Sequence, residues 1–315
     1  MSLDAAFSSL CAPSVRAELP SELKAPLATL SKKVASQRRL NANGNVARSM
    51  RQTSCYFHLA KRWLAQSQKP LTACEIGFNV GHSASVFLTA LGPSSRYVGF
   101  ELSEASRMFP KQRRLVTAAL AVLNGSAGLF PGRIDLVYGN SLQSAPRFLA
   151  SHPNFRCDLL SIDGDHTLEY VFGDWRNFKS RLNPERHLIL FDDINHHHPI
   201  FAARRFRDPE LHLIGCMRLS GMADDDESLA LYKLLKARGK NVTRPLIASD
   251  AFCVARHSTA ADLRVPRWAV EKTQGDDEAM YRRIPRDEMA AARRYYSMMA
   301  IKPIAALGVI SASTP

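Results

Sequence analysis

The sequence predicts an α/β protein whose core is a doubly wound, mainly parallel seven-stranded sheet, with helical extensions at both ends. From about residue 71 onward, short apolar runs alternate with helical stretches, which is the pattern of a parallel sheet covered by helices on both faces. Polar and acidic residues follow directly where several of these runs end. Because ligands of such sheets gather at the carboxyl ends of the strands, the same pattern predicts a binding site there.

The predicted strands are short apolar runs bounded by turn-forming residues. The first five are ACEIGF, YVGFEL, RIDLVYG, CDLLSID and HLILFDDI, and helical stretches such as SASVFLTAL separate them. The last two, LHLIGCMRL and AFCVARH, flank a polar insert over residues 220–250 and are predicted to close the sheet as an antiparallel pair. We expect residues 1–68 to be a basic helical segment, 69–258 the domain built on the sheet, and 259–315 a charged helical extension.

The composition is that of an ordinary globular protein, with 46% hydrophobic and 23% charged residues. No apolar run approaches the roughly 20 residues that span a bilayer, and the first residues lack the basic start and apolar core of a signal peptide. We therefore expect a cytoplasmic protein without a membrane partner. The six cysteines are scattered and show no paired spacing, which favours small, reduced core residues over disulfides or zinc ligands.

The net charge of +13 permits an anionic partner such as nucleic acid. The excess of basic residues is concentrated near the two ends, over residues 32–51 and 282–294. No recognised nucleic-acid motif accompanies these clusters, so a solvated basic surface is the favoured interpretation and nucleic acid the second one.

A glycine-containing loop follows the first predicted strand and opens a helix, with Glu75, Gly77, Asn79, Gly81 and Ser83 at alternate positions. The two glycines allow tight turns and a close approach to a ligand, and the helix start offers free N–H groups to an anion. Asn79 replaces the second glycine of the dinucleotide pattern, and no lysine follows as in a phosphate-binding loop. A nucleoside with a carboxylate tail therefore fits better than a pyrophosphate. For the loop alone, a turn without any ligand is an equal alternative.

The ends of the second and third predicted strands add polar groups to the same edge. Glu101 ends the second strand, at about the distance beyond the glycine loop where an acidic residue grips a ribose diol. Asn140 and Ser141 follow the third strand, where an amide and a hydroxyl could border an adenine ring. A solvated strand end is an equally good interpretation of this third pair.

Together, the segments EIGFNVGHS, FE, SIDGDH and LILFDD resemble the class I S-adenosylmethionine-dependent methyltransferases, over about residues 71–257. The resemblance is greatest to the branch of macrocin-type sugar O-methyltransferases and cephalosporin-hydroxylase-like proteins, and the chain is also similar to catechol-type O-methyltransferases. It implies a Rossmann-like sheet and a 69–258 domain that binds S-adenosylmethionine. It also implies that Glu75, Gly77, Asn79, Gly81 and Ser83 hold the methionine part of the cofactor. Glu101 would bind its ribose, and Asn140 and Ser141 would lie near its adenine.

Acidic residues end the fourth and fifth predicted strands. Asp163 ends DLLSID, and Asp192 and Asp193 end HLILFDD. If these strands are neighbours, their ends lie about 5 Å apart, and like charges so close favour a cation between them. Oxygen ligands suit a hard divalent ion such as Mg²⁺, and the related metal-dependent methyltransferases place acidic or amide ligands at these two strand ends. We therefore predict a metal site, although Asp163 could contact the cofactor without any metal, and Asp192 and Asp193 could simply end a strand.

His166, three residues after Asp163, would be the general base by resemblance to the sugar O-methyltransferases. Metal coordination lowers the pKa of a hydroxyl, and imidazole can take its proton near neutral pH. A helix-capping or packing role is the alternative for this histidine. The predicted function is metal-assisted O-methylation of a small-molecule hydroxyl. The alternatives are a nucleic-acid-associated methyltransferase and a cofactor-binding protein with a different activity or none, and a homo-oligomer is compatible with either.

Overall fold

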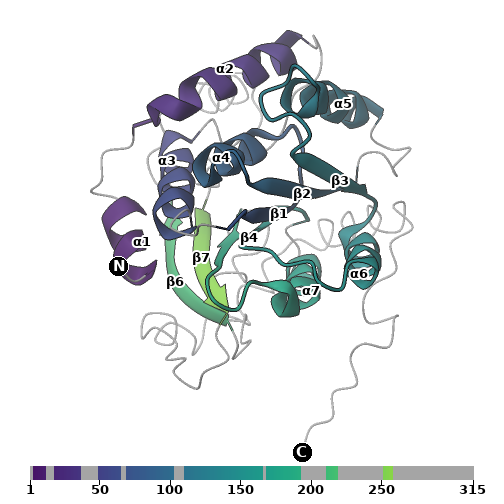
Figure 1. Cartoon of the computed structure of the whole chain (residues 1–315). Helices are drawn as coiled ribbons and strands as arrows, with labels where there is room; N and C mark the ends of the chain where they lie inside the picture. Colours follow the sequence, from purple (N-terminus) through teal and green to yellow (C-terminus); the bar gives the residue numbers. More distant parts are fainter. Residues whose placement is uncertain are drawn as a thin grey trace, which may run out of the picture.

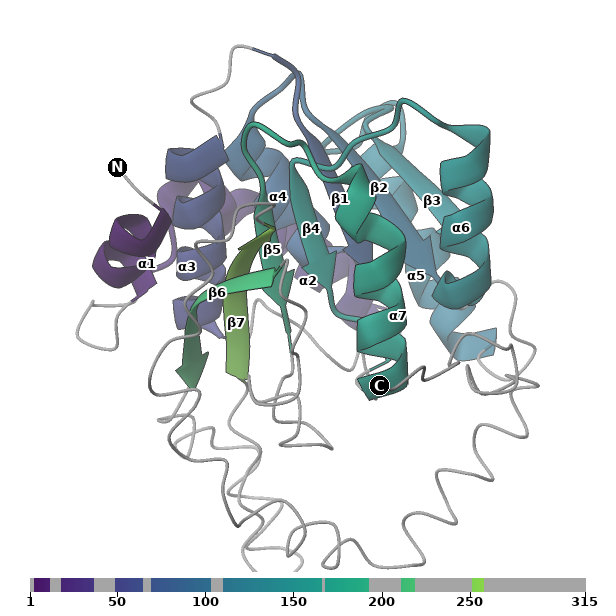
Figure 2. The same cartoon turned by 90° about the horizontal axis from the view of Figure 1, so that it is seen from below.

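The computed structural model describes residues 3–11, 18–36, 49–64, 69–102, 110–165, 168–192, 211–218 and 251–257. These residues form a sheet of seven strands in the order β3-β2-β1-β4-β5-β7-β6. The parallel strands are β1 (Thr72–Ile76), β2 (Arg96–Glu101), β3 (Ile134–Tyr138), β4 (Leu159–Ile162) and β5 (Leu188–Phe191). The antiparallel pair is β6 (Leu211–Arg218) and β7 (Ala251–His257), and β7 pairs with β5 (Figure 2). The predicted fold class is confirmed.

The order of the strands reverses at β1. The chain moves outward from β1 to β2 and β3, then returns to the other side of β1 with β4 and β5. Polar groups at the carboxyl ends of β1 and its two neighbours therefore face the crevice in which such sheets bind ligands.

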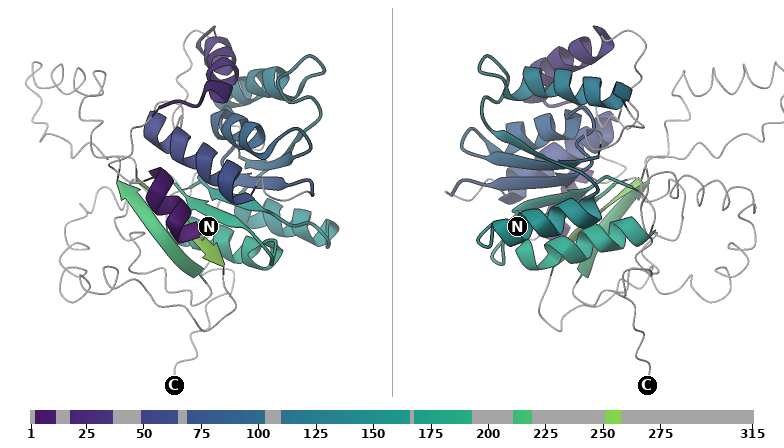
Figure 3. Two further views of the ribbon diagram at one scale, coloured as in Figure 1. Left: turned by 60° about the vertical axis from the view of Figure 1, so that its left-hand side comes forward. Right: turned by 90° about the vertical axis from the view of Figure 1, so that its right-hand side faces the viewer.

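Helices cover both faces of the sheet (Figures 1 and 3). On one face lie α4 (His82–Leu91) and α5 (Pro110–Asn124), and on the other α6 (Ser141–Ser151) and α7 (Leu168–Phe178), which the 3-10 turn η3 (Lys179–Arg181) follows. Successive strand residues alternate between two hydrophobic cores: Ala73 packs on the α4 side, whereas Ile76 packs on the α6 and α7 side.

The N-terminal helices extend the α4 and α5 layer. They are α1 (Leu3–Cys11), α2 (Ser21–Ser36) and α3 (Met50–Leu59), and the π-helical turn η2 (Ala60–Leu64) continues α3. Helix α2 packs against α4 and α5, α3 packs against α4, and α1 packs against α3 and β6. The helical character predicted before residue 68 is thus observed. The predicted insert over residues 220–250 and the predicted extension over 259–315 lie outside the described residues.

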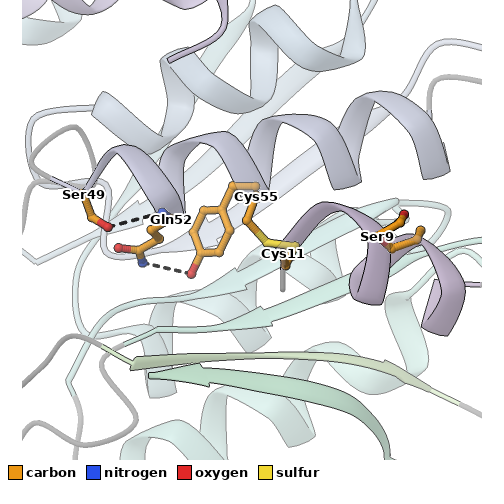
Figure 4. The surroundings of a disulfide bond; sticks show 7 residues. Ser9, Cys11, Ser49, Gln52 and Cys55 are labelled. Carbon is orange, nitrogen blue, oxygen red and sulfur yellow. Dashed lines mark hydrogen bonds between the residues drawn. A yellow bond between two sulfur atoms is a disulfide. The ribbon is translucent and has the colours of Figure 1, made fainter. Parts of the chain in front are cut away.

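The prediction that the cysteines are reduced is wrong for the four whose pairing the structure gives. Cys11 bonds to Cys55 with Cα atoms 5.0 Å apart, and Cys74 bonds to Cys157 with Cα atoms 5.8 Å apart. The partners are separated by 44 and 83 residues, so no local spacing could reveal them. The first disulfide joins α1 to α3 (Figure 4), and the second joins β1 to the residues that enter β4. All four cysteines are buried, as the sequence predicted.

Candidate active site

A cavity of about 260 Å³ opens at the carboxyl ends of β1 to β4. Its wall includes six of the residues predicted for the site, namely Gly77, Asn79, Glu101, Asn140, Ser141 and Asp163. The fold therefore brings the ends of four separate strands together around one space. Glu75, Gly81 and Ser83 do not line this cavity.

The glycine loop presses its backbone against the end of β4. Gly77 has φ +95°, and a Cβ added there would overlap the carbonyl oxygen of Asp163. Gly81, the N-cap of α4, has φ +74°, and Asn79 between them also adopts the left-handed region, with φ 50°. Glycine and, to a lesser extent, asparagine are the residues that tolerate this conformation. The loop consequently brings its backbone close to the end of β4 at the cavity.

Glu101 is held in place from the glycine loop. The Asn79 N–H donates to Glu101 Oε2 at 2.8 Å, and the Gln112 amide donates to Asn79 Oδ1 at 2.6 Å. Both Glu101 and Gln112 line the cavity. A carboxylate has lone pairs for several donors, so this contact leaves Glu101 the capacity to accept from a diol. Gln112 was not predicted from the sequence, because it lies in the first turns of α5 without any motif.

Glu75 is fully buried beneath the loop, at 0% exposure. Its carboxylate accepts hydrogen bonds from the hydroxyls of Tyr97 and Ser83, the latter at 2.7 Å. Burial raises the pKa of Glu75 to about 7, and the hydrogen bonds from these hydroxyls and from Ser161 oppose that shift. Glu75 and Ser83 thus join β1, β2 and α4 under the loop. The structure places them to support the loop from behind.

Asn140 caps helix α6 and positions a tyrosine. Its Oδ1 accepts from the Leu142 N–H at 3.0 Å, and its Nδ2 donates to the Tyr170 hydroxyl at 3.0 Å. Tyr170, on the first turn of α7, is buried and lines the cavity beside Ser141. The side chain of Asn140 is therefore engaged within the protein, and Tyr170 is a cavity residue that sequence reasoning missed. No pattern marked it, since it is one of many aromatic residues on amphipathic helices.

Asp163 and Asp192 end neighbouring strands, as predicted. Strands β4 and β5 are paired in parallel with Ile162 opposite Phe191, and the Asp192 N–H donates to the Ile162 carbonyl at 3.0 Å. The two carboxylates offer oxygen donors of the kind that hard cations prefer. Asp193 and His166 lie outside the described residues, and within the described part of the chain no group of three or more His, Cys, Asp and Glu residues is arranged to hold a metal.

Gln52 is a further residue at this acidic edge. It lies in the first turn of α3, and its Nε2 is 2.7 Å from both carboxylate oxygens of Asp192. The two residues are 140 positions apart, and sequence reasoning did not find Gln52 because nothing in the segment before residue 68 indicated that it reaches the sheet edge.

Residues 74–194 match the family model described as a methyltransferase domain. This part of the chain is a methyltransferase domain. It contains the glycine loop, Glu101, Asn140 and both acidic strand ends. The resemblance to methyltransferases that the sequence predicted is thereby confirmed over these residues. Helix α3, which carries Gln52, precedes the matched residues.

The methyltransferase domain and its surroundings are similar to solved O-methyltransferase structures. An O-methyltransferase from Bacillus cereus, in complex with S-adenosylhomocysteine, is 14% identical with a TM-score of 0.50, over 81% of this chain and 97% of that chain. The O-methyltransferase TomG from Streptomyces achromogenes, involved in tomaymycin synthesis, was solved in complex with S-adenosylmethionine. It is 17% identical with a TM-score of 0.45, over 81% of this chain and 96% of that chain. The first similarity establishes a shared fold. No curated protein matches the sequence.

Proposed function

We propose that this chain transfers the methyl group of S-adenosylmethionine to a hydroxyl of a small molecule, with the help of a divalent cation. The observation that carries the proposal is the position of Asp163. Asp163 lines the cavity with the glycine loop and Glu101, and it also neighbours Asp192 at the end of the next strand. A cofactor in the cavity and an acceptor at the acidic edge would therefore meet at this one residue. The Bacillus cereus O-methyltransferase of the same fold, solved with S-adenosylhomocysteine, supports the choice of cofactor.

The cavity residues have distinct roles in this proposal. The backbone at Gly77 and Asn79 contacts the methionine part, while Glu101 accepts hydrogen bonds from the ribose hydroxyls. Ser141 and Tyr170 border the adenine, because the amide of Asn140 is already used to cap α6 and to hold Tyr170. Glu75, Gly81 and Ser83 act from behind by fixing the shape of the loop.

The acidic edge prepares the acceptor. Asp163 and Asp192, with Asp193, are the residues that would hold a hard cation, and their oxygen donors fit Mg²⁺. The bound cation would lower the pKa of an acceptor hydroxyl, and S-adenosylmethionine would supply the methyl group. His166 takes the proton from the acceptor oxygen at its imidazole nitrogen. Holding the acceptor oxygen in line with the methyl carbon then supplies much of the rate.

Two other functions stay open to test. A nucleic-acid-associated methyltransferase is favoured by the net charge of +13 alone. A cofactor-binding protein with another activity, or none, would use the same cavity without the acidic edge. We also keep the sequence-based predictions of cytoplasmic residence and of a small-molecule partner as proposals. No helix among the described residues is long and apolar enough to cross a membrane.

We expect S-adenosylhomocysteine to bind the unaltered protein and Glu101→Ala to weaken that binding about 10–100-fold, the range for a lost charge-assisted hydrogen bond. Isothermal titration measures this. Asp135→Ala is the matched control, because Asp135 is an acid on the neighbouring strand β3 that pairs with Arg96 in solvent. Its affinity should be unchanged. If NAD binds in place of S-adenosylhomocysteine, the proposed cofactor is wrong.

The metal part of the same proposal is tested with a chelator in a methyl-transfer assay over a panel of phenols, sugars and polyols. Transfer should stop in excess chelator and return with Mg²⁺, while S-adenosylhomocysteine still binds. Full activity in the chelator contradicts the metal role and leaves the cofactor site standing. Tight, salt-resistant binding of a defined RNA or DNA would favour the nucleic-acid alternative.

A further inference from the structure

Helix α3 delivers one polar side chain to the acidic edge from outside the matched methyltransferase domain. Ser49 caps this helix, its hydroxyl accepting from the Gln52 N–H at 3.2 Å, so the backbone at Gln52 is fixed in the first turn (Figure 4). The Gln52 side chain is only 4% exposed. The N–H groups of a buried amide need acceptors within the protein, and the identity of those acceptors indicates the role of the residue.

The acceptors of the Gln52 amide are the two oxygens of Asp192 and one hydroxyl. Nε2 lies 2.7 Å from Asp192 Oδ1, 2.7 Å from Oδ2 and 3.1 Å from the Tyr56 hydroxyl. Contacts from one nitrogen to both oxygens hold the Asp192 carboxylate against the first turn of α3. The same contacts stabilise the negative charge of Asp192. Without them, the repulsion between this carboxylate and that of Asp163 would raise the free energy of the folded protein.

The rest of α3 is anchored to several elements, which makes Gln52 a rigid support. Cys55 is bonded to Cys11 of α1, and the ring of Tyr56 packs edge-on against Phe252 of β7, with centroids 4.9 Å apart. Tyr56 also contacts Phe87 of α4. A donor on such a framework can hold a ligand carboxylate within the tolerance that a metal site requires.

We propose that Gln52 is a positioning residue for the cation of the acidic edge: it orients the Asp192 carboxylate from α3 and so sets the affinity of the edge for a divalent metal. The inference rests on the proposed metal-assisted function. Residues that hydrogen-bond to metal ligands typically contribute 10–100-fold to metal affinity or activity, and Gln52 has that relation to Asp192. The N-terminal helices are therefore part of the active site and not an accessory to it.

The test is Mn²⁺ binding, measured by electron paramagnetic resonance on the full chain without acceptor, together with S-adenosylhomocysteine titration and thermal unfolding. Gln52→Leu keeps the size of the side chain and removes its donors. We expect its Mn²⁺ affinity to fall by roughly 10–100-fold while its affinity for S-adenosylhomocysteine stays within a factor of about two. Tyr56→Phe is the matched control. It removes the hydroxyl that accepts from the Gln52 amide but leaves both contacts between that amide and Asp192. Its Mn²⁺ affinity should stay near that of the unaltered protein.

A second variant covers the case in which Gln52→Leu does not fold. Gln52→Glu places a carboxylate against Asp192, so it should unfold at a lower temperature without metal and gain more from added Mn²⁺ than the unaltered protein does. Unchanged Mn²⁺ affinity in Gln52→Leu, or equal gains in Gln52→Glu, overturns the role of Gln52. If the unaltered protein binds no Mn²⁺ while it still binds S-adenosylhomocysteine, the metal role fails and the role of Gln52 fails with it.

Discussion

Asp174 brings a carboxylate into the interior of the protein, behind the cavity wall at Ser141. It is on α7, at 0% exposure, and its two carboxylate oxygens have no hydrogen-bond partner among the described residues. Burial raises the pKa of Asp174 to about 7, and the nearby charge of Asp165 adds to the shift, while the Ser141 hydroxyl opposes it. The acid is therefore largely protonated below neutral pH in the folded protein, whereas in the unfolded chain it ionises near pH 4.

This difference predicts a pH dependence of stability. Between about pH 4 and pH 7 the unfolded chain releases the proton that the folded protein retains, so the free energy of unfolding falls as the pH rises. Asp174→Asn removes this contribution and should stabilise the protein by about 2–4 kcal/mol at pH 8 relative to its effect at pH 5. Urea unfolding at the two pH values measures it. A residual slope of the same sign should persist from Glu75, whose pKa is also raised.

The control for this measurement is Asp135→Asn, since that acid lies on the surface of β3. Its slope with pH should match the unaltered protein. An Asp174→Asn variant with that same slope would show that the buried carboxylate is ionised in the folded state.

At the scale of elements, the turn from β1 into α4 requires a glycine, without a side chain, at position 77. Gly77 has a positive φ and no room for a Cβ, because the Asp163 carbonyl occupies that place. Gly77→Ala should therefore cost more than about 3 kcal/mol in urea unfolding, or prevent folding, and abolish S-adenosylhomocysteine binding. The substitution forces either the loop or the end of β4 to move, and both form the cavity.

Gly92 is the matched control for this change. It follows α4, has φ +88°, and a Cβ there would meet nothing within 4 Å. Gly92→Ala should cost only the strain of the backbone conformation, about 1–3 kcal/mol, and leave binding intact. Equal costs for the two variants would contradict the close approach between the loop and β4.

The elements of the sheet could largely be predicted from the sequence, because buried parallel strands are near-continuous apolar runs. ACEIGF contains the residues of β1 from Ala73 on, and the run HLILFDDI contains β5 and ends with Asp192 at the observed edge. The pairing of β4 with β5 followed from the order of elements in such a fold. Gly77, Glu101 and Asp163 could be assigned to one cavity for the same reason, since each directly ends a strand.

The contributions of α3 and α7 could not be predicted in this way. Gln52 reaches Asp192 across 140 positions, and Tyr170 lines the cavity and accepts a hydrogen bond from Asn140. Both contacts depend on how a helix is rotated and placed on the sheet. That placement is set by the packing of many side chains, among them Tyr56 against Phe87, and leaves no spacing in the sequence.

At the scale of the whole molecule, two disulfides tie distant parts of the chain together. They join α1 to α3 and β1 to the entry of β4. Disulfides of this kind persist in oxidising compartments, so an oxidising compartment is the alternative to the cytoplasmic residence proposed above. A strong reductant should lower the free energy of unfolding by about 2–5 kcal/mol.

Urea unfolding with and without reductant measures this difference, and a thiol titration of the unfolded, unreduced protein identifies the cysteines that are bonded. Cys11, Cys55, Cys74 and Cys157 should not react until reductant is added. Four reactive thiols at these positions, with unchanged unfolding in reductant, would restore the original prediction of reduced core cysteines.

The pairing of these cysteines also bears on how the chain matures. Each of the first two pairs joins a cysteine to the next one along the sequence: Cys11 to Cys55, then Cys74 to Cys157. A ribosome releases the chain from its N-terminus, so Cys55 emerges before Cys74 does. The first bond can therefore close while the second pair is still absent, and an error such as Cys55 with Cys74 requires the first closure to fail. The order of synthesis therefore favours the observed pairing.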